Sequence, residues 1–185
     1  MNVMFMRRMT TALLTVGVCT SAWGAAPSSS APQPATWMDH DVAVSLQNLP
    51  KTYTCDELWY KFRDMLLLLG AKSDFRITAQ HCAFASGPQD RSPQVELHFS
   101  LAQALTAAQI KYATVMVVAS TGTLEPNSKP HSFTKADCGL VQQINDLLLP
   151  AVPVTVVKKS LDCGAAGSGN YNLSIQTLTP ALAQR

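Results

Sequence analysis

Apolar and polar positions recur with recognisable periods along most of the chain from Trp37 onward. Two segments carry apolar residues at helical spacing, and six shorter segments alternate or run apolar as strands do. The helices are predicted between Thr54 and Gly70 and between Thr134 and Pro150, and the strands at 42–47, 75–81, 94–100, 112–119, 154–161 and 171–177. The nearly continuous apolar run 112–119 predicts the most buried strand.

Both predicted helices have start and stop signals in the sequence. Thr54 and Glu57 are spaced as a capping box, in which each side chain bonds the backbone of the other residue. Gly70 stands where a left-handed C-terminal cap is expected. The second helix begins near Thr134 in the same way, and Pro150 stops it. The apolar stripe on each helix predicts one buried face.

The two helical segments belong to a weak internal repeat. Residues 58–67 align with residues 140–149 at an offset of 82, and they share five apolar positions and one aspartate. In both places a cysteine precedes the segment, another follows it, and an alternating run comes next. Identity is low, so chance similarity between two amphipathic helices is the alternative explanation. The agreement of element order and cysteine placement favours a duplication.

These patterns predict an α+β protein made of two similar β-α-β-β halves, residues 37–109 and residues 110–185. We expect antiparallel strands with the two helices packed on one face. The pattern does not decide whether the halves share one sheet or form two small sheets.

The first 36 residues differ from the rest in composition. Residues 1–24 combine two arginines, a short apolar stretch and small residues at their end, which is typical of a secretory signal peptide. The apolar stretch is too short for a membrane anchor. A lipoprotein that keeps Cys19 is disfavoured, because Val18 before it is not small. Residues 25–36 are rich in Pro, Ser and Ala and are predicted to be a linker.

Charge and hydropathy exclude several functional classes. Without residues 1–24 the chain has 161 residues with 12 basic and 12 acidic side chains, so it has no basic field for nucleic acid. No stretch reaches the roughly 18 apolar residues that a membrane span needs, so no stable span is expected after cleavage. The short signal segment indicates a bacterial protein, periplasmic or secreted.

Four cysteines remain in the exported chain, and an even number indicates two disulfides. They are Cys55 and Cys82 in the first half, with a sequence separation of 27, and Cys138 and Cys163 in the second half, with a separation of 25. Sequence alone allows three pairings, and the repeat favours Cys55–Cys82 with Cys138–Cys163. Thiol redox chemistry is disfavoured, because no two of these cysteines are closer than 25 residues.

Sequence motifs for catalysis, nucleotide binding and metal binding are lacking. The chain contains no Gly-x-Gly-x-x-Gly, P-loop, His-Glu-x-x-His or Gly-x-Ser-x-Gly pattern, and no two histidines are spaced i, i+4. We therefore expect no catalytic residue, no metal site and no cofactor. A hydrolase that uses His81 or His98 is the enzymatic alternative, which a large pocket with perturbed titratable groups would favour.

Two aromatic residues beside the first apolar stripe point to a function. Trp59 and Tyr60 have Val141 and Gln142 as their matches in the second helix. Aromatics on a partly exposed helix face are typical interface anchors, and core packing between the halves is the simpler alternative. We therefore predict a non-enzymatic protein-binding or assembly module of the cell envelope, with an envelope protein as partner. The alternative is a periplasmic protein that binds a small ligand or a metal in a cleft between the halves.

Overall fold

The computed structural model describes residues 31–82, 92–129 and 132–181, so the predicted signal peptide 1–24 lies outside the described residues. The strands are β1 (Gln33–Ser45), β2 (Arg76–Gln80), β3 (Gln94–Ala104), β4 (Val115–Leu124), β5 (Thr155–Cys163) and β6 (Gly169–Pro180). The helical elements are α1 (Cys55–Leu68), η1 (Ala107–Tyr112), η2 (Lys135–Asp137), α2 (Cys138–Gln143), η3 (Ile144–Leu148) and η4 (Leu149–Ala151). The predicted α+β class is confirmed.

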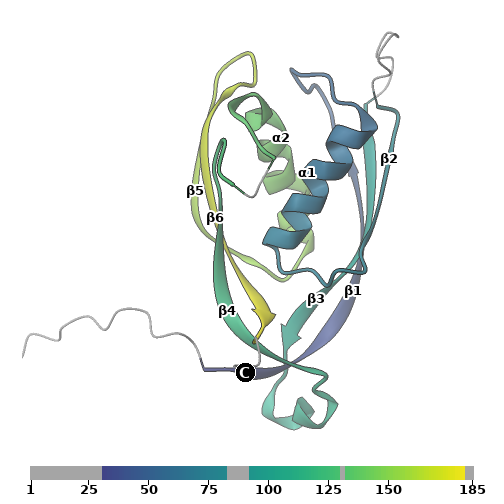
Figure 1. The fold of residues 1–185 in the computed structure, drawn as a ribbon, viewed down its shortest axis with the longest axis vertical. Helices are drawn as coiled ribbons and strands as arrows, with labels where there is room; N and C mark the ends of the chain where they lie inside the picture. The colour runs from purple at the N-terminus through teal and green to yellow at the C-terminus, as the bar shows by residue number, and fades with distance from the viewer. Residues whose placement is uncertain (1–30, 83–91, 130–131, 182–185) are drawn as a thin grey trace, which may run out of the picture.

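All six of these strands form one sheet, in the order β2-β3-β1-β4-β6-β5, and every neighbouring pair is antiparallel. Figure 1 shows the sheet bent into two arms, one with β1, β2 and β3 and the other with β4, β5 and β6. Both α1 and α2 lie between the arms (Figure 1). Within the sheet the arms are joined by the pairing of residues 33–35 of β1 with residues 115–117 of β4. Both predicted halves therefore contribute to one sheet.

One hydrophobic core fills the space between the arms and the helices. Strand β3 shows the alternation that builds it, because its odd-numbered residues 95–101 are buried while Gln94, Glu96 and His98 are exposed. The apolar stripes of both helices meet these strands in a single cluster, whose fully buried members include Leu58, Phe62, Leu97, Leu140, Ile144 and Leu173. Burial of this apolar surface is the main favourable term in folding.

Local sequence signals set both ends of α1, as predicted. The Thr54 hydroxyl accepts from the Glu57 N–H at 3.1 Å, and the Glu57 carboxylate accepts from the Thr54 N–H at 3.0 Å. At the other end Gly70 has φ +76°, which suits glycine, and Ala71 N–H donates to the Leu66 carbonyl at 3.0 Å. This is the hydrogen bonding of a Schellman motif. The cap and the stop signal therefore confine α1 to the predicted segment.

The second helical segment is less regular than predicted. Over residues 135–151 it passes through 3-10 (η2), α (α2), π (η3) and again 3-10 (η4) geometry. The π turn is closed by the Leu149 N–H, which donates to the carbonyl of Ile144 five residues earlier. Pro150 has no N–H to donate, so regular helical bonding ends there. The segment begins directly after the predicted start at Thr134, and its last turn contains Pro150, the predicted stop, and ends at Ala151.

The beginning of β1 differs from the prediction. The strand starts at Gln33, inside the range 25–36 that the composition predicts as a linker. Residues 33–35 pair with β4 and residues 35–45 pair with β3, so this segment has partners on both sides. Backbone hydrogen bonding from other parts of the chain thus orders residues whose own side chains give little reason to fold.

The prediction that residues 112–119 form the most buried strand is wrong. Among the residues of β4 only Val117 and Leu124 are buried, whereas β3 and β6 lie in the middle of their arms and bury more. Tyr112 belongs to the turn η1 and is exposed. The apolar run instead supplies a small separate cluster, in which Val117 packs with Ala35 and Ala102 where the arms join.

Two disulfides are present with the pairing that the repeat favours. Cys55 at the start of α1 is bonded to Cys82 after β2, with a Cα–Cα distance of 5.2 Å. Cys138 at the start of α2 is bonded to Cys163 at the end of β5, at 5.5 Å. Disulfides are typical of oxidising, extracellular environments. Within the described ranges no helix is both long and apolar enough to cross a membrane.

Candidate functional site

Trp59 and Tyr60 lie on the solvent-facing side of α1. Their side chains are 37% and 52% exposed, so they do not pack in the core where the halves meet. The two rings form an edge-to-face pair with centroids 5.1 Å apart and planes at 88°. This geometry is favourable for aromatic pairs, because the positive edge of one ring meets the negative face of the other. The pair is therefore an ordered aromatic surface rather than two independent side chains.

Arg63 lies one turn further along α1 and contacts both rings. Its guanidinium carbon is 5.8 Å from the ring centre of Trp59 and 5.9 Å from that of Tyr60, which is cation–π range. In the described part of the chain Arg63 has no hydrogen bond and no ion pair, so its N–H donors are open to a partner. Arg63 was not predicted as a site residue, although its spacing of three and four from the aromatics places it on their helix face.

These residues belong to one row on the outer side of α1, which we call the α1 stripe: Asp56, Trp59, Tyr60, Arg63 and Leu67. Arg63 is half-buried and the other four are exposed. Helical spacing places them on one side, and Leu67 at one end is 48% exposed. Asp56 at the other end is exposed and, like Arg63, forms no hydrogen bond or ion pair within the described residues. The stripe thus presents two aromatic rings and one leucine, with a free carboxylate and a free guanidinium.

A second polar cluster is buried where the two halves meet. The Asp137 carboxylate accepts hydrogen bonds from Lys61 Nζ at 2.8 Å, from the Tyr53 hydroxyl at 3.0 Å and from the Thr134 N–H at 2.7 Å. Lys61 also donates to the carbonyl of Ser132. Tyr53 and Lys61 come from the first half and Asp137 from the second, so this network ties the halves together.

The surroundings set the ionisation of the network. Burial by itself raises the pKa of Asp137, but hydrogen bonds from Lys61 and Thr134 outweigh it and hold that pKa below its usual value. Burial, together with the negative charge of Asp137, raises the pKa of Tyr53 far above its usual value. At neutral pH the Asp137 carboxyl group is therefore charged and the Tyr53 phenol is neutral, so the Tyr53 hydroxyl can donate a hydrogen bond to the carboxylate. The cluster is arranged as a structural link.

Asp64 belongs to the same junction. Its side chain is buried and accepts from the Ser132 N–H at 2.7 Å. Lys61 and Asp64 therefore bond both backbone groups of Ser132, one the carbonyl and the other the N–H. Lys61 and Asp64 are polar residues of α1 that look solvent-facing in the sequence, but both of them contact the loop before α2.

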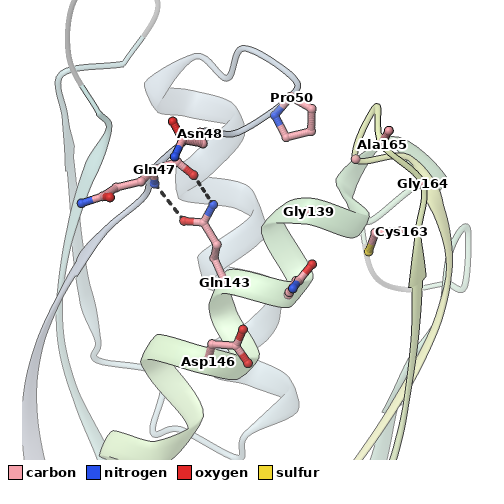
Figure 2. Close-up of a pocket in the computed structure, with 11 residues that line it drawn as sticks. Gln47, Asn48, Pro50, Gly139, Gln143, Asp146, Cys163, Gly164 and Ala165 are labelled. Atoms are coloured by element: carbon pink, nitrogen blue, oxygen red, sulfur yellow. Dashed lines mark hydrogen bonds between the residues drawn. The ribbon is translucent and has the colours of Figure 1, made fainter.

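A surface hollow of about 330 Å³ lies between the loop after β1 and α2 (Figure 2). The Gln143 side chain spans its edge: its carbonyl accepts from the Gln47 N–H at 2.9 Å and its amide donates to the Gln47 carbonyl. The remaining lining residues are Asn48, Pro50, Gly139, Gln142, Asp146, Cys163, Gly164, Ala165 and Gly167. Residues 47–50 come from the first half and the others from the second, so this hollow lies between the halves.

A hollow of about 350 Å³ lies over β1 and β3 near His98. Nδ1 of His98 is hydrogen-bonded to Asp41, and the Ser100 hydroxyl donates to Asp39 at 2.7 Å. Serine and histidine thus bond different carboxylates, and they do not form a nucleophile–base pair. The side chains of His98 and Asp41 are 54% and 79% exposed, so water reaches both groups. This arrangement is that of a solvated sheet surface.

The other candidate residues for chemistry are also dispersed. His81 is exposed after the end of β2, whose register pairs Arg76 with His98. His81 is therefore five residues further along, on the order of 16 Å from His98. Cys55, Cys82, Cys138 and Cys163 are all in disulfides, so none of them offers a thiolate. In residues 31–82, 92–129 and 132–181 no group of three His, Cys, Asp or Glu is arranged to hold a metal ion.

Comparison with known proteins adds no functional information. No protein-family model matches the chain, and no curated protein or solved structure matches it either. The α1 stripe and the hollow between the halves are the two surfaces whose geometry bears on function.

Proposed function

We propose that this chain is an exported module that binds a protein of the cell envelope through the α1 stripe. The observation that carries the proposal is the exposed Trp59–Tyr60 pair with Arg63 over both rings. Trp, Tyr and Arg are the residue types most enriched among those that dominate binding energy in protein interfaces. A contiguous exposed apolar surface rimmed by charge is typical of an interaction site.

The way α1 is held favours this role. The capping box and the Cys55–Cys82 bridge fix its first turn, and its opposite side is buried in the core. Side chains on such a platform lose little conformational freedom when a partner arrives, which favours affinity. The stripe thus combines suitable residue types with a preorganised backbone.

Export to the periplasm or beyond is part of the proposal. It is supported by the signal peptide predicted at residues 1–24 and by two disulfides, which form in oxidising compartments. N-terminal sequencing of the protein recovered from a periplasmic fraction tests this step. We expect a mature chain that begins at Ala25, and a chain that keeps residues 1–24 would overturn it.

We further propose that the two halves are copies of one β-α-β-β unit. Read outward from the centre, the sheet order is β1-β3-β2 on one side and β4-β6-β5 on the other. In the central pairing Gln33 lies opposite Val117 and Ala35 lies opposite Val115. At the offset of 82 Gln33 corresponds to Val115 and Ala35 to Val117, so exchanging the halves leaves this pairing unchanged. A chance similarity of two helices does not account for such a register.

Two contacts between the halves also correspond to each other when the halves are exchanged. Lys61 and Asp64 on α1 bond the carbonyl and the N–H of Ser132, in the loop before α2. In return Gln143 on α2 bonds both backbone groups of Gln47, in the loop before α1. Lys61 and Gln143 stand 82 positions apart. Each helix therefore holds the loop of the other half from an equivalent position.

The α1 stripe departs from this correspondence, and that departure supports a binding role. The positions that match Trp59 and Tyr60 are Val141, which is buried, and Gln142. The fold tolerates the absence of exposed aromatics in the second half, so it does not require them in the first. Exposed aromatics that are present on α1 but absent from the matching positions of α2 are better explained by binding to a partner than by a need of the fold.

In-cell crosslinking of the tagged chain, followed by mass spectrometry of the captured proteins, tests the proposal. We expect one reproducible envelope protein, whose capture is lost in Trp59→Ala and in Tyr60→Ala. Tyr112→Ala is the matched control, because Tyr112 is 62% exposed but lies on η1. Equal capture by the wild type and both stripe variants would overturn the proposal, as would equal loss in the control.

The hollow in Figure 2 supports a second candidate, a small polar ligand bound between the halves. Its lining offers the amides of Asn48 and Gln142 and the carboxylate of Asp146, which suits a neutral or cationic polar molecule. A thermal-shift screen of amino acids and sugars tests this candidate. A shift that disappears in Gln142→Ala supports it, and no shift for any compound counts against it.

A further inference from the structure

We propose that the α1 stripe binds a second copy of this chain, through an antiparallel contact of α1 with α1. The inference rests on the proposed function, because it uses the same surface, and it adds a second copy of the chain as an occupant of that surface. The two-fold axis of the contact would pass between Trp59 and Tyr60, so that the same residues of both copies meet.

Charge complementarity within the stripe carries the inference. Asp56 and Arg63 lie seven positions apart, which is about two helical turns, and so they share one side of α1. Within the described residues neither one has a hydrogen bond or an ion pair. In an antiparallel contact centred between residues 59 and 60, Asp56 of one copy lies opposite Arg63 of the other. The symmetry forms this ion pair twice, once on each side of the axis.

The same arrangement places the aromatic pairs at the centre of the contact. Trp59 of one copy comes level with Tyr60 of the other, and the charges flank them. A parallel contact would set Arg63 against Arg63 and Asp56 against Asp56, and like charges would oppose it. The order of charges along α1 therefore selects one relative direction of the two helices.

The size of the stripe sets the strength of this dimer. It runs from Asp56 to Leu67, which is about three turns of helix, and a contact of that length buries less than the roughly 1,200 Å² of a standard interface. We therefore expect a dimer that dissociates on dilution. Because its ion pairs lie at the rim, we also expect it to weaken as salt is raised.

Sedimentation velocity of the mature full chain over a concentration series tests the proposal. We expect a monomer–dimer equilibrium that is weakened about tenfold or more in Asp56→Arg and in Arg63→Asp, because each variant sets like charges opposite one another. The double variant Asp56→Arg/Arg63→Asp restores opposite charges and should regain dimerisation. Tyr112→Ala is the control for an exposed aromatic outside the stripe, and circular dichroism checks that each variant is folded.

Three outcomes would overturn the second copy as the occupant. The first is a wild-type chain that stays monomeric at about 1 mM, a concentration at which even a millimolar Kd would give detectable dimer. The second is a dimer that both single variants leave intact. The third is a double variant that stays monomeric. The crosslinking experiment separates this inference from the proposed function. A monomeric chain that captures an envelope protein through Trp59 refutes only the second copy, whereas a dimer without any other captured protein refutes only the envelope partner.

Discussion

The ammonium group of Lys61 lies 2.8 Å from the carboxylate of Asp137, and these side chains are only 7% and 0% exposed. The pair links α1 of the first half to the turn that precedes α2. Removal of one partner leaves the other charge buried without its counterpart, which typically costs about 3–5 kcal/mol. We expect Lys61→Met to lower the free energy of unfolding by that order, as measured by urea denaturation.

Lys159→Met is the matched control for this prediction. Lys159 lies 3.6 Å from Asp146, but these side chains are 46% and 53% exposed, so the ion pair is solvated. Such surface pairs contribute about 0.5 kcal/mol or less. Equal losses in the two variants would contradict the role assigned to the buried pair.

Asp137 also predicts a loss of stability in acid. Despite the opposing effect of burial, hydrogen bonds from Lys61 and Thr134 hold its pKa below the usual value. A carboxyl group of this kind stabilises the fold above its unfolded pKa of about 3.9 and loses that contribution as the pH falls through the folded value. We expect the Tm to fall below about pH 4 more steeply in the wild type than in Asp137→Asn. Parallel Tm–pH curves for the two proteins would refute this.

Tyr53 predicts a second loss of stability, at alkaline pH. Burial and the charge of Asp137 raise the pKa of Tyr53, so its neutral form is favoured in the folded state. That contribution is fully present below the unfolded pKa of about 10 and is lost as the pH rises above it. We expect ultraviolet titration of the wild type to show two tyrosines that ionise only when the protein unfolds, and Tyr53→Phe to show one. Tyr171, whose pKa burial also raises, should remain as a late-ionising group in that variant.

The Cys55–Cys82 bridge closes a loop of 27 residues at the first turn of α1. In the chain-entropy model such a bridge contributes roughly 3–4 kcal/mol. We expect Cys55→Ala/Cys82→Ala to lose stability by that order in urea denaturation, and to keep the second bridge in non-reducing peptide mapping. Mapping of the wild type that joins Cys55 to Cys138 or Cys163 would contradict the pairing.

Gly167 predicts a steric requirement at the contact between the halves. A Cβ there would lie 1.8 Å from Cγ of Pro50, and the residue has φ +67°. We expect Gly167→Ala to be destabilised by roughly 1 kcal/mol or more in thermal unfolding, because both the contact and the backbone oppose a side chain. Gly164→Ala in the same turn is the control, since the nearest atom to its Cβ is 3.4 Å away. The two variants should differ clearly in Tm.

Features encoded over a few residues could be predicted from the sequence. The Thr54 cap and the Gly70 stop depend on neighbours within one turn, and both are present. Alternation placed the centres of the strands for the same reason. The disulfide pairing was also predicted, because each predicted helix has one cysteine before it and another after it in the sequence.

Features that depend on distant parts of the chain could not be predicted in the same way. Gln33 is in a strand only because β4 lies beside it. Asp64 and Lys61 look like solvated helix positions until the loop before α2 covers them. Arg63 is the intermediate case: its helical spacing was readable from sequence, but its lack of an ion partner within the described residues required the surrounding structure.

The pairing of Val117 with Gln33 on one side and with Pro180 on the other has a mechanical consequence. Both ends of the described chain leave the fold next to one residue of β4, from strands that are both antiparallel to it. Gln33 and Pro180 lie on opposite sides of Val117, so a pull between these ends would act across the strands, and the three pairs between β1 and β4 would open one at a time. If the protein is anchored by one end and loaded through the other, the pairing of residues 33–35 with residues 115–117 is the first part of the sheet to separate.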